Sequence, residues 1–531
     1  MKPPLLIILI VFTLAHTVAA AETKPPHILV ILADDLGYGD MQCNNPERGK
    51  IPTPNIDRLA AQGMRFTDGH SSSGVCSPSR YSLLTGRFHW RTRLQSGIAG
   101  VFGEPLIAPD RMTIDAFAKT AHRFVNSHVT VPICQPGRSA LMTGRVPHRN
   151  GALGFNPIRR DVPTLVEVLR DRGYFTGVIA KGVHMAPADK FPWDAVGEQA
   201  LGKQPTKFAE RLREMLASAA SERKPFFINA NICDPHRPFI HGTGKKAKGD
   251  EPLDGARIFK PDEVTVPAFL EDIPRVREEV AQYYSSVSRF DVAFGLVLKE
   301  LTAAGRDTDT VVVFMSDHGM SFPFSKATVY YNGTWSPVLI RYPGQKEPRA
   351  HTEFVSSVDI MPSVLELLGA KPPAGMDGRS WVPLLNGKAQ ADRDFVVTHV
   401  NTVSSGKSFA QRCIRTKSRS LMFHAWVGGP DKFRVEAMSG LSYAAMNASA
   451  DAKVQARVKQ LVEGEPLMLF DTAADPTERK NLIRELARRV LRRVLQGTRQ
   501  CPHLLCHSHH HPQAREVRRP PGVDGGVRPY H

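Results

Sequence analysis

The sequence predicts an α/β protein with a mainly parallel sheet, helices flanking that sheet, and a smaller α+β subdomain at the C-terminal end. Short apolar segments alternate with segments of helical periodicity over most of the chain, and closely spaced short strands follow from about Asp392. The 531 residues are 42% hydrophobic and 23% charged, as in an ordinary globular protein. This length is sufficient for one large domain with a sizeable core and a smaller domain beside it.

The first expected strand is His27–Ala33, an apolar run typical of strands buried in a parallel sheet. Helical spacing follows over Pro54–Gly63. The alternation of helix and strand then returns along the chain, as expected for parallel strands joined by helices. The further expected segments are the helix Thr164–Arg172 with the strand Thr176–Ala180, the strand Pro225–Asn231, the helix Glu278–Ala304 with the strand Asp309–Met315, and the strand Val338–Arg341.

The C-terminal region is expected to form short antiparallel strands. The candidates are Phe395–His399, Arg412–Arg415, Ser420–His424 and Leu467–Asp471. We therefore expect a large domain over residues 22–390 and a subdomain over residues 391–485.

The N-terminal residues predict export. Lys2 is followed by the apolar run Leu5–Leu14 and then by Val18-Ala19-Ala20-Ala21, the pattern of a secretory signal peptide cleaved near Ala21. The apolar run is too short to span a membrane. No other stretch approaches eighteen apolar residues, so we expect residues 1–21 to be removed and the mature protein to have no membrane span.

The net charge of +17 predicts an acidic partner, such as a sulfated glycan or a nucleic acid. Much of this charge has another source, because residues 484–531 hold ten arginines against Glu485, Glu516 and Asp524. We expect residues 486–531 to be a disordered basic tail, and we expect no nucleic-acid partner. A weaker interpretation of this tail is metal binding by its histidines, which are His507, His509, His510 and His511.

Seven cysteines in a chain of this size do not predict a disulfide framework. Their spacing suggests no pairing. We expect Cys43, Cys233 and Cys413 to be buried or free thiols.

The most specific local signal is a short motif that occurs twice. Cys76-Ser-Pro-Ser-Arg80 continues to Thr85-Gly86-Arg87, and Cys134-Gln-Pro-Gly-Arg138 continues to Thr143-Gly144-Arg145. Either copy alone is also explained by a buried cysteine beside a helix start, with Pro in the first turn. Cys-x-Pro-x-Arg followed by Thr-Gly-Arg resembles the activation site of the type I sulfatases. The first copy fits that pattern throughout, whereas the second has Gln135 and Gly137 where small hydroxyl residues are usual.

This resemblance implies an alkaline-phosphatase-like fold and hydrolysis of a sulfate ester or a sulfamate. In the family, a formylglycine-generating enzyme oxidises the signature cysteine to formylglycine. Its hydrate offers one oxygen that attacks sulfur and a second that later expels the sulfate. The run from Leu467–Asp471 through Asp475-Pro476-Thr477-Glu478 to Asn481-Leu482 resembles the end of the sulfatase C-terminal subdomain. The resemblance therefore covers about residues 25–485.

The duplication extends beyond the motif. The offset, 134 minus 76, is 58 residues, and it also relates Ile56-Asp57 to Ile114-Asp115 and Arg65-Phe66 to Arg123-Phe124. Two near-copies, over 56–87 and 114–145, suggest a junction between pieces of two related sulfatases rather than a solenoid. A natural tandem insertion is the alternative. We favour Cys134 as the converted cysteine, because more of the domain follows it directly, and we expect the copy around Cys76 to be looped out.

Acidic residues follow two of the expected strands. Asp34 and Asp35 come directly after the first strand, and Asp317-His318 comes after the strand ending at Met315. Taken singly, each pair is better explained as a turn or helix cap. Beside the cysteine signature they resemble the calcium site of sulfatases, since hard divalent cations take oxygen ligands. His318 fits least well, because imidazole suits softer metals and many members of the family have Asn there.

The remaining candidates follow strands or loops downstream. Lys181 and His184 lie in Ala-Lys-Gly-Val-His, His236 lies in Asp-Pro-His-Arg-Pro, and Lys326 lies beyond Asp317-His318. Each alone is better explained as a surface lysine or a structural histidine. The resemblance implies that Lys181 with Arg138 or Arg80 holds the formylglycine and that His184 helps turn over the intermediate. It implies that His236 and Lys326 bind sulfate and protonate the leaving group.

The part of the chain after residue 113 resembles the sulfamidase, or heparan N-sulfatase, branch of the family, and the part before it resembles general arylsulfatases. The sulfamidase resemblance rests on Asp234-Pro-His-Arg-Pro-Phe, the Lys181–His184 loop, Thr398-His-Val-Asn and Arg412-Cys-Ile-Arg-Thr-Lys-Ser. We therefore expect a sulfated saccharide substrate, with N-sulfated glucosamine favoured. The alternatives are an O-sulfate arylsulfatase, a phosphomonoester or phosphonate hydrolase of the same superfamily, and an inactive chimera that only binds sulfated glycans.

Overall fold

The structure is a computed structural model that describes residues 27–33, 38–45, 47, 51–66, 121–240, 254–345 and 347–489. The expected signal peptide, Asp34, Asp35, Cys76, Arg80 and residues 490–531 lie outside these ranges. The described residues up to Asn481 belong to one compact unit, and residues 482–489 belong to a second unit. The expected boundary at 390/391 lies within the first unit and stays a prediction.

The first unit contains a large twisted sheet, in which the described residues supply nine strands. Eight of them run parallel, and β8 alone is antiparallel to its neighbours, which confirms the predicted mainly parallel sheet. The strands, in spatial order, are β5 (Ala195–Gly197), β4 (Phe175–Ile179), β6 (Phe226–Ile232), β1 (His27–Ala33), β7 (Thr310–Ser316), β8 (Val338–Arg341), β2 (Met64–Phe66), β3 (His122–His128) and β9 (Ala350–Ser356).

Helices cover both faces of this sheet, because the alternating side chains of its central strands enter two separate apolar clusters. On β7, Val312 and Phe314 belong to one cluster, whereas Val311 and Val313 belong to the other. The first cluster is completed by α1 (Pro54–Gln62), α7 (Pro205–Ser221) and α8 (Pro274–Ala303). The second is completed by α4 (Cys134–Thr143), α6 (Leu165–Asp171), α10 (Ile360–Leu367) and α11 (Val382–Leu385).

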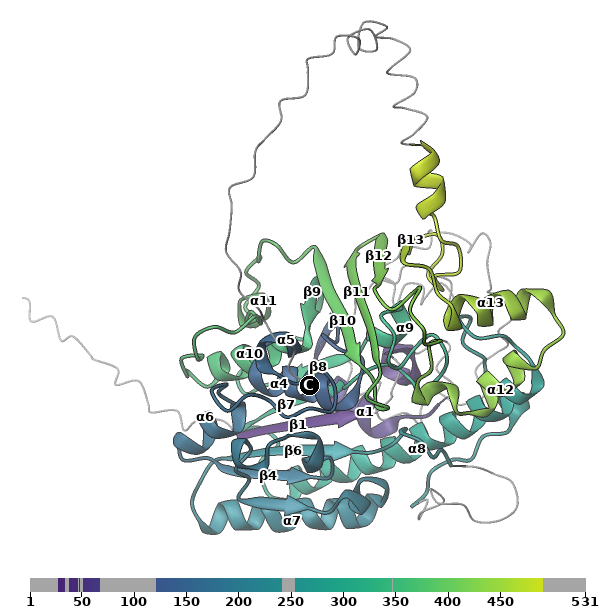
Figure 1. Cartoon of the computed structure of the whole chain (residues 1–531). Helices are drawn as coiled ribbons and strands as arrows, with labels where there is room; N and C mark the ends of the chain where they lie inside the picture. The colour runs from purple at the N-terminus through teal and green to yellow at the C-terminus, as the bar shows by residue number, and fades with distance from the viewer. Residues whose placement is uncertain are drawn as a thin grey trace, which may run out of the picture. The chain divides into compact units, whose positions relative to one another are not determined.

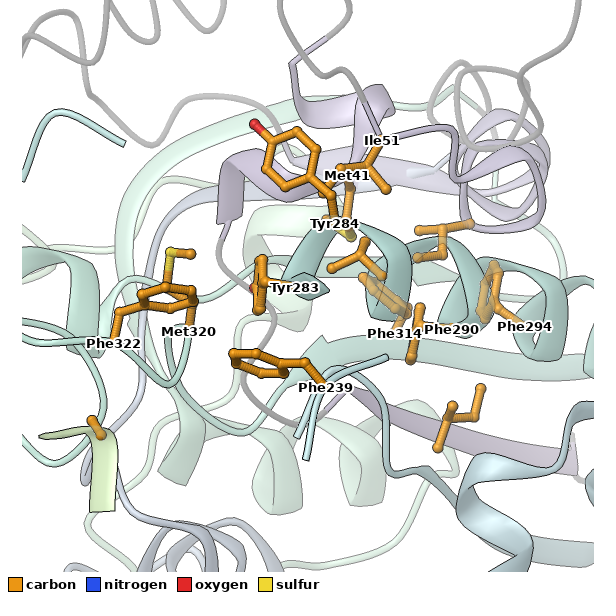
Figure 2. Close-up of a cluster of buried hydrophobic side chains, with 14 of the residues drawn as sticks. Met41, Ile51, Phe239, Tyr283, Tyr284, Phe290, Phe294, Phe314, Met320 and Phe322 are labelled. Carbon is orange, nitrogen blue, oxygen red and sulfur yellow. The ribbon is translucent and has the colours of Figure 1, made fainter. Parts of the chain in front are cut away.

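The long helix α8 anchors the first cluster (Figure 2). Phe290 and Phe294 lie on α8, and each ring packs against Phe314 of β7, with ring centroids 6.0 and 5.3 Å apart. Tyr283, on the same helix, packs edge-on against Phe239 and Phe322. Aromatic contacts of this kind add to the free energy gained by burying the rings. They fix α8 beneath the segments that follow β6 and β7.

The predicted antiparallel strands form a separate four-stranded sheet within the same unit (Figure 1). Its order is β10 (Phe395–Thr402), β11 (Ser408–Thr416), β12 (Arg419–His424) and β13 (Leu467–Asp471). The inner face contributes Cys413, Met422 and Phe470 to the first apolar cluster. The small helices α12 (Leu441–Asn447) and α13 (Ala452–Val462) follow β12 in the chain.

The described strands of the two copies of the duplicated segment are neighbours in the large sheet. β2 belongs to the first copy and β3 to the second, and they pair in parallel. Met64 and His122, which are equivalent at the offset of 58, both pair with Ile340 of β8. The expectation that the first copy is looped out is therefore wrong for residues 56–66, which form the end of α1 and β2. Residues 67–120 lie outside the described residues.

The structure also extends or corrects other expectations. Residues 483–489 are helical, so the expected disorder from residue 486 does not hold for residues 486–489. Cys43, Cys233 and Cys413 are buried, as predicted. Among the described helices, none combines the length and apolar character needed to cross a membrane.

Candidate active site

The predicted site residues that the structure describes follow the carboxyl ends of neighbouring strands. Cys134 comes after β3, Lys181 after β4, His236 after β6 and Asp317 after β7. In a parallel sheet these ends share one edge, where ligands usually bind. The tertiary structure thus brings together residues that lie up to 183 positions apart in the chain, from Cys134 to Asp317.

Cys134 is the first residue of α4, and its side chain is 3% exposed. Gly137, which lies one turn further along this helix, occupies a position without space for a side chain. A Cβ atom at Gly137 would lie 2.8 Å from the Val131 carbonyl oxygen and 3.6 Å from the Asp317 carbonyl oxygen. The sequence suggested that Gly137 departs from the usual signature, and the structure gives the reason, because a side chain there would force α4 away from the strand ends.

Cys134, Asp317 and His318 form one buried cluster, with one ligand atom from each lying within 4.8 Å of the others. The Cys134 Sγ atom is 3.3 Å from His318 Nε2, and the other ring nitrogen of His318 is 2.9 Å from the Gly319 carbonyl oxygen. His318 Nε2 is 3.7 Å from Asp317 Oδ1. The predicted nucleophile and two predicted metal ligands therefore share one small buried volume.

Arg138 places a buried positive charge on this cluster. Its Nη2 atom donates to Asp317 Oδ2 at 2.9 Å, and its Nη1 atom donates to Asn231 Oδ1. The side chains of Arg138 and Asp317 are only 1% and 2% exposed. Because charged groups of opposite sign interact strongly away from water, this pair fixes the orientation of both side chains.

Asn231 also connects Arg138 to the loop that carries Lys181. Its Nδ2 atom donates to the carbonyl oxygens of Ile179 and Ala180, at 3.2 and 3.1 Å, as β4 ends. Lys181 is buried and has a left-handed backbone, with φ of +52°, and its N–H donates to Gln199 Oε1. Such a backbone is uncommon outside glycine and marks positions that the surroundings hold firmly.

His184 lies three residues further, at the end of the short 3₁₀ helix η7 (Gly182–His184). Its backbone N–H donates to the Lys181 carbonyl oxygen at 3.0 Å, and its ring lies edge-on to Phe155. Helix α4 packs against η7, which places the Lys181–His184 loop beside the helix of Cys134.

His236 and Lys326 are brought together by an acidic residue that the sequence interpretation missed. Glu436, in the 3₁₀ helix η12 (Glu436–Met438), has one carboxylate oxygen 3.3 Å from Lys326 Nζ and the other 3.5 Å from His236 Nε2. Lys326 is buried, whereas the Glu436 side chain is 33% exposed. Glu436 lies 110 residues beyond Lys326, in a segment without a recognisable motif, so no signal in the sequence identified it.

The loop that carries His236 rests on a buried ion pair. Asp234 accepts from Arg289 Nε at 2.6 Å and from Nη2 at 3.0 Å, and both side chains are at most 1% exposed. Lys203 Nζ donates to the carbonyl oxygens of His236 and Pro238. Burial lowers the pKa of Lys203, although the neighbouring Asp234 opposes this change. One sequence feature could have indicated this ion pair, namely the charged residue Arg289 within the apolar stretch of α8.

The described residues fit a calcium ion only in part. Asp317 offers the oxygen that Ca²⁺ prefers, but the Cys134 thiol and the His318 imidazole suit softer metals. Oxidation of Cys134 would replace sulfur by oxygen, and Asp34 and Asp35 would add carboxylates, but these two residues lie outside the described part of the chain. Of the three side chains in this cluster, Asp317 is therefore the one whose chemistry suits calcium without modification.

Comparison with protein families agrees with this fold. The sulfatase family model matches residues 26–106 and 93–370, which together are more than half of the chain. The chain belongs to the sulfatase family, a class of sulfuric ester hydrolases. A second model, the C-terminal region of N-sulphoglucosamine sulphohydrolase, matches residues 317–427. The two overlapping matches to one model are consistent with the duplicated segment.

The most similar characterised proteins include two human enzymes. N-sulphoglucosamine sulphohydrolase is 30% identical over 325 residues, which are 55% of this chain and 64% of the human protein. The match thus spans less than two thirds of that relative. Arylsulfatase A is 25% identical over 518 residues, covering 88% of this chain and 86% of the human protein. An ulvan-active sulfatase of Formosa agariphila is 28% identical over 481 residues, covering 87% and 78%.

Solved structures show the same fold. BT1596, a 2-O GAG sulfatase, superposes with a TM-score of 0.55 at 18% identity, covering 91% of this chain and 94% of its own. BT4656, solved in complex with its substrate D-glucosamine-2-N,6-O-disulfate, superposes with a TM-score of 0.56 at 17% identity, covering 90% and 98%. The predicted alkaline-phosphatase-like α/β architecture is thereby confirmed.

Proposed function

We propose that this protein removes sulfate from N-sulfated glucosamine of the heparan sulfate type, through a formylglycine formed from Cys134 and with a bound calcium ion. The observation that carries the proposal is the buried cluster of Cys134, Asp317 and His318, to which Arg138 adds a positive charge. Hydrolysis of a sulfuryl group requires a nucleophile, positive charge near its oxygens and a proton for the leaving group. The described residues supply candidates for each.

The nucleophile is assigned to residue 134. Once formed, the formylglycine hydrate would supply one oxygen to attack sulfur and a second to expel sulfate afterwards. Arg138 holds the base of the site by donating to Asp317 and Asn231. Lys181, together with Arg138, would hold the formylglycine, and His184 would help turn over the covalent intermediate. Arg80 and Cys76 hold the equivalent positions of the first copy in sequence.

His236 and Lys326 are assigned to sulfate binding and to protonation of the leaving group. Both side chains approach Glu436 in the described structure, so they converge on one place although they come from different loops. A leaving amine or alcohol departs more readily when it receives a proton in the transition state.

Calcium binding is assigned to Asp34, Asp35, Asp317 and His318. The pairing of β1 with β7 supports it, because Ala33, the residue before Asp34, pairs with Ser316, the residue before Asp317. Bound calcium would hold the sulfuryl oxygens and withdraw charge from sulfur. The described residues that would contribute are Asp317 and His318.

The substrate assignment follows the C-terminal half of the chain. Lys326, Thr398 and Arg412 lie within residues 317–427, the range that matches the N-sulphoglucosamine sulphohydrolase model. Because arylsulfatases are among the relatives, an O-sulfate ester is the second candidate substrate. An inactive chimera that only retains sulfated glycans is the third, and the duplicated signature motivates it.

Maturation and location complete the proposal. We infer export after cleavage near Ala21, conversion of the cysteine by a formylglycine-generating enzyme, and a domain division at 390/391. The basic tail beyond residue 485 is assigned no role in the reaction.

The test is co-expression of the full chain with a formylglycine-generating enzyme, followed by mass spectrometry of the peptides around Cys76 and Cys134. We expect conversion of Cys134 and sulfate release from N-sulfoglucosamine that exceeds release from an O-sulfated aryl ester. The Cys134→Ala variant should release none, while Cys76→Ala should match the wild type. Faster hydrolysis of a phosphate monoester would point to the related phosphohydrolases. Conversion of neither cysteine, with heparin retention and no turnover, would favour the inactive chimera.

A further inference from the structure

The four-stranded sheet of β10, β11, β12 and β13 has an exposed apolar face. Along β12, Leu421 and Phe423 are exposed and Met422 between them is buried, since successive side chains of a strand point to opposite sides of the sheet. The large apolar side chains on the exposed side, which we call the outer face, are 37% to 49% exposed and are Phe395, Val397, Ile414, Leu421, Phe423 and Leu467. They are half of the twelve exposed large apolar side chains among the described residues.

The outer face is continuous, because the strand register places its side chains opposite one another. Val397 is opposite Ile414, and Ile414 is opposite Leu421. Phe423 is opposite Leu467 of β13. The Cβ atoms of directly opposite residues in an antiparallel pair lie about 5 Å apart, so their side chains contact each other. The outer face therefore crosses all four strands.

Apolar residues at these outward positions are unusual for a sheet with one face in water. Such a sheet carries apolar side chains toward the core and polar side chains toward the solvent. Here the inner side chains Cys413, Met422 and Phe470 already belong to an apolar cluster. Apolar residues on the outer side as well are expected of a sheet that is covered on both faces.

The two edges of this sheet are partly capped, which favours contact through the face. On β13, the Asn481 side chain accepts from the Leu469 N–H at 2.9 Å and donates to the Leu467 carbonyl oxygen at 3.2 Å. On β10, the His399 N–H donates to the Thr130 carbonyl oxygen. Backbone groups with such partners do not invite pairing with a strand of another chain.

The size of the outer face suits a partner protein. At the exposures given above, its six side chains present on the order of 500 Å² of apolar surface, as much as the largest patches of monomeric proteins, which often mark interfaces. A stable homodimer buries about 800 Å² on each subunit, with an apolar centre inside a polar rim. The outer face is therefore large enough to form the centre of a dimer interface.

The charges around the outer face are of both signs. The exposed or partly exposed charged residues of the rim are Arg412, Lys417 and Arg419 on one side of the balance and Asp394 and Asp471 on the other. Arg419 already contacts Asp471. A strongly acidic or strongly basic partner would be selected by an excess of one sign. A mixed rim can instead meet its own copy, because two-fold symmetry lets a positive side chain of each subunit approach a negative one of the other.

We propose that the outer face binds the same face of a second copy of this chain, so that the protein is a two-fold symmetric dimer joined through its C-terminal sheets. Two apolar sheet faces pack about 10 Å apart with their side chains interdigitated. The outer face contains none of the residues assigned to the reaction. The dimer is therefore independent of the proposed function and can be tested on protein that has not been converted to the formylglycine form.

The experiment is sedimentation equilibrium of the full chain at concentrations from about 0.1 to 100 μM, which covers moderate and tight dimers. We expect the wild type to approach twice the chain mass of 58.7 kDa. Phe423→Glu should raise the dimer Kd at least about a hundredfold, because two copies of the change enter each dimer. Val196→Glu is the matched control, since Val196 is a 58% exposed apolar residue on a strand of the other sheet, and it should dimerise as the wild type does.

A second variant, Ile414→Lys, tests the centre of the outer face and should weaken the dimer as Phe423→Glu does. Thermal unfolding of each variant verifies that it is folded. A wild type that stays monomeric at every concentration would overturn the proposal, and its sedimentation with phosphatidylcholine vesicles would then identify the outer face as a membrane contact. A dimer that both folded variants leave unchanged would also overturn it, because the interface would then lie elsewhere.

Discussion

The guanidinium of Arg138 donates to Asp317 Oδ2 at 2.9 Å, and this buried contact joins two segments that lie 179 residues apart in the chain. It connects the first turn of α4 with the end of β7, so the predicted nucleophile and a predicted metal ligand are held by one interaction. Buried charge pairs of this kind contribute more to geometric definition than to net stability.

Replacing Arg138 with Lys should therefore reduce activity more than stability. Lysine keeps the positive charge but cannot donate simultaneously, in a planar arrangement, to Asp317 and Asn231. We expect kcat/KM for sulfate release to fall by about 10²–10³, the loss typical of one positioned electrostatic group. Steady-state kinetics on the formylglycine-containing enzyme, with thermal melting as control, measures both quantities. A variant with wild-type kcat/KM would show that this contact does not organise the site.

The ion pair between Asp234 and Arg289 is expected to support the His236 loop. Arg289→Met leaves the Asp234 carboxylate buried without its bidentate partner, so the free energy of unfolding should fall by about 3–5 kcal/mol. The matched control is Arg159→Met, since Arg159 pairs with Asp161 at the surface, where water screens the charges and a much smaller loss of stability is expected. Urea denaturation compares the two variants, and equal losses would contradict the structural assignment.

The duplicated segment leads us to predict that a variant lacking one copy will still fold. Removing residues 64–121 joins Gly63 to His122, and His122 already shares with Met64 the partner Ile340 on β8. We expect the shortened chain to unfold cooperatively and to keep its activity, because β3 can follow α1 directly and Cys134 remains. Circular dichroism melts and sulfate release measure the outcome. Loss of activity in a folded deletion variant would instead assign catalysis to Cys76.

Buried histidines predict a stability that declines in acid. Burial, with the nearby Arg412 and His148, lowers the pKa of His399 to about 3, and burial lowers the pKa of His424 to about 4. Below the ordinary value of 6.5, the unfolded chain binds protons that the folded chain does not, so stability is full above about pH 6.5 and is lost as the pH falls toward these folded values. Each histidine contributes a slope of up to about 1.4 kcal/mol per pH unit.

Urea titrations at pH 5 and pH 8 measure this dependence. The double variant His399→Gln/His424→Gln should show a smaller difference between the two pH values than the wild type does, whatever its absolute stability. An unchanged difference would mean that other groups account for the acid sensitivity.

Calcium binding can be measured apart from catalysis. A ligand at about a hundredfold excess over its Kd stabilises the folded state by about 2.7 kcal/mol, so calcium should raise the Tm of the chelator-treated protein. Asp317→Asn should weaken this response, because an amide oxygen carries no charge for the ion. Stabilisation by zinc but not by calcium would show that the thiol of Cys134 and the imidazole of His318 decide the metal.

Much of the fold could be predicted from local sequence. The apolar run His27–Ala33 and the strand Val338–Arg341 have the predicted bounds, and α8 and β13 were located correctly. The spacing of apolar residues in these segments follows directly from which side chains are buried. The strands β3 and β9 were missed, because polar residues such as Arg123 and Asn126 are buried there by partners distant in sequence.

The sequence by itself determined the family signature that contains Cys134, the strand ends that precede Asp317 and His236, and the duplication at an offset of 58 residues. Only the tertiary structure decided that Asn231 joins Arg138 to the Lys181 loop, that Glu436 lies between His236 and Lys326, and that both copies of the repeat enter one sheet. The physical reason is that motifs and periodicity are properties of neighbouring residues. A buried hydrogen bond or ion pair is decided by which distant segments pack together.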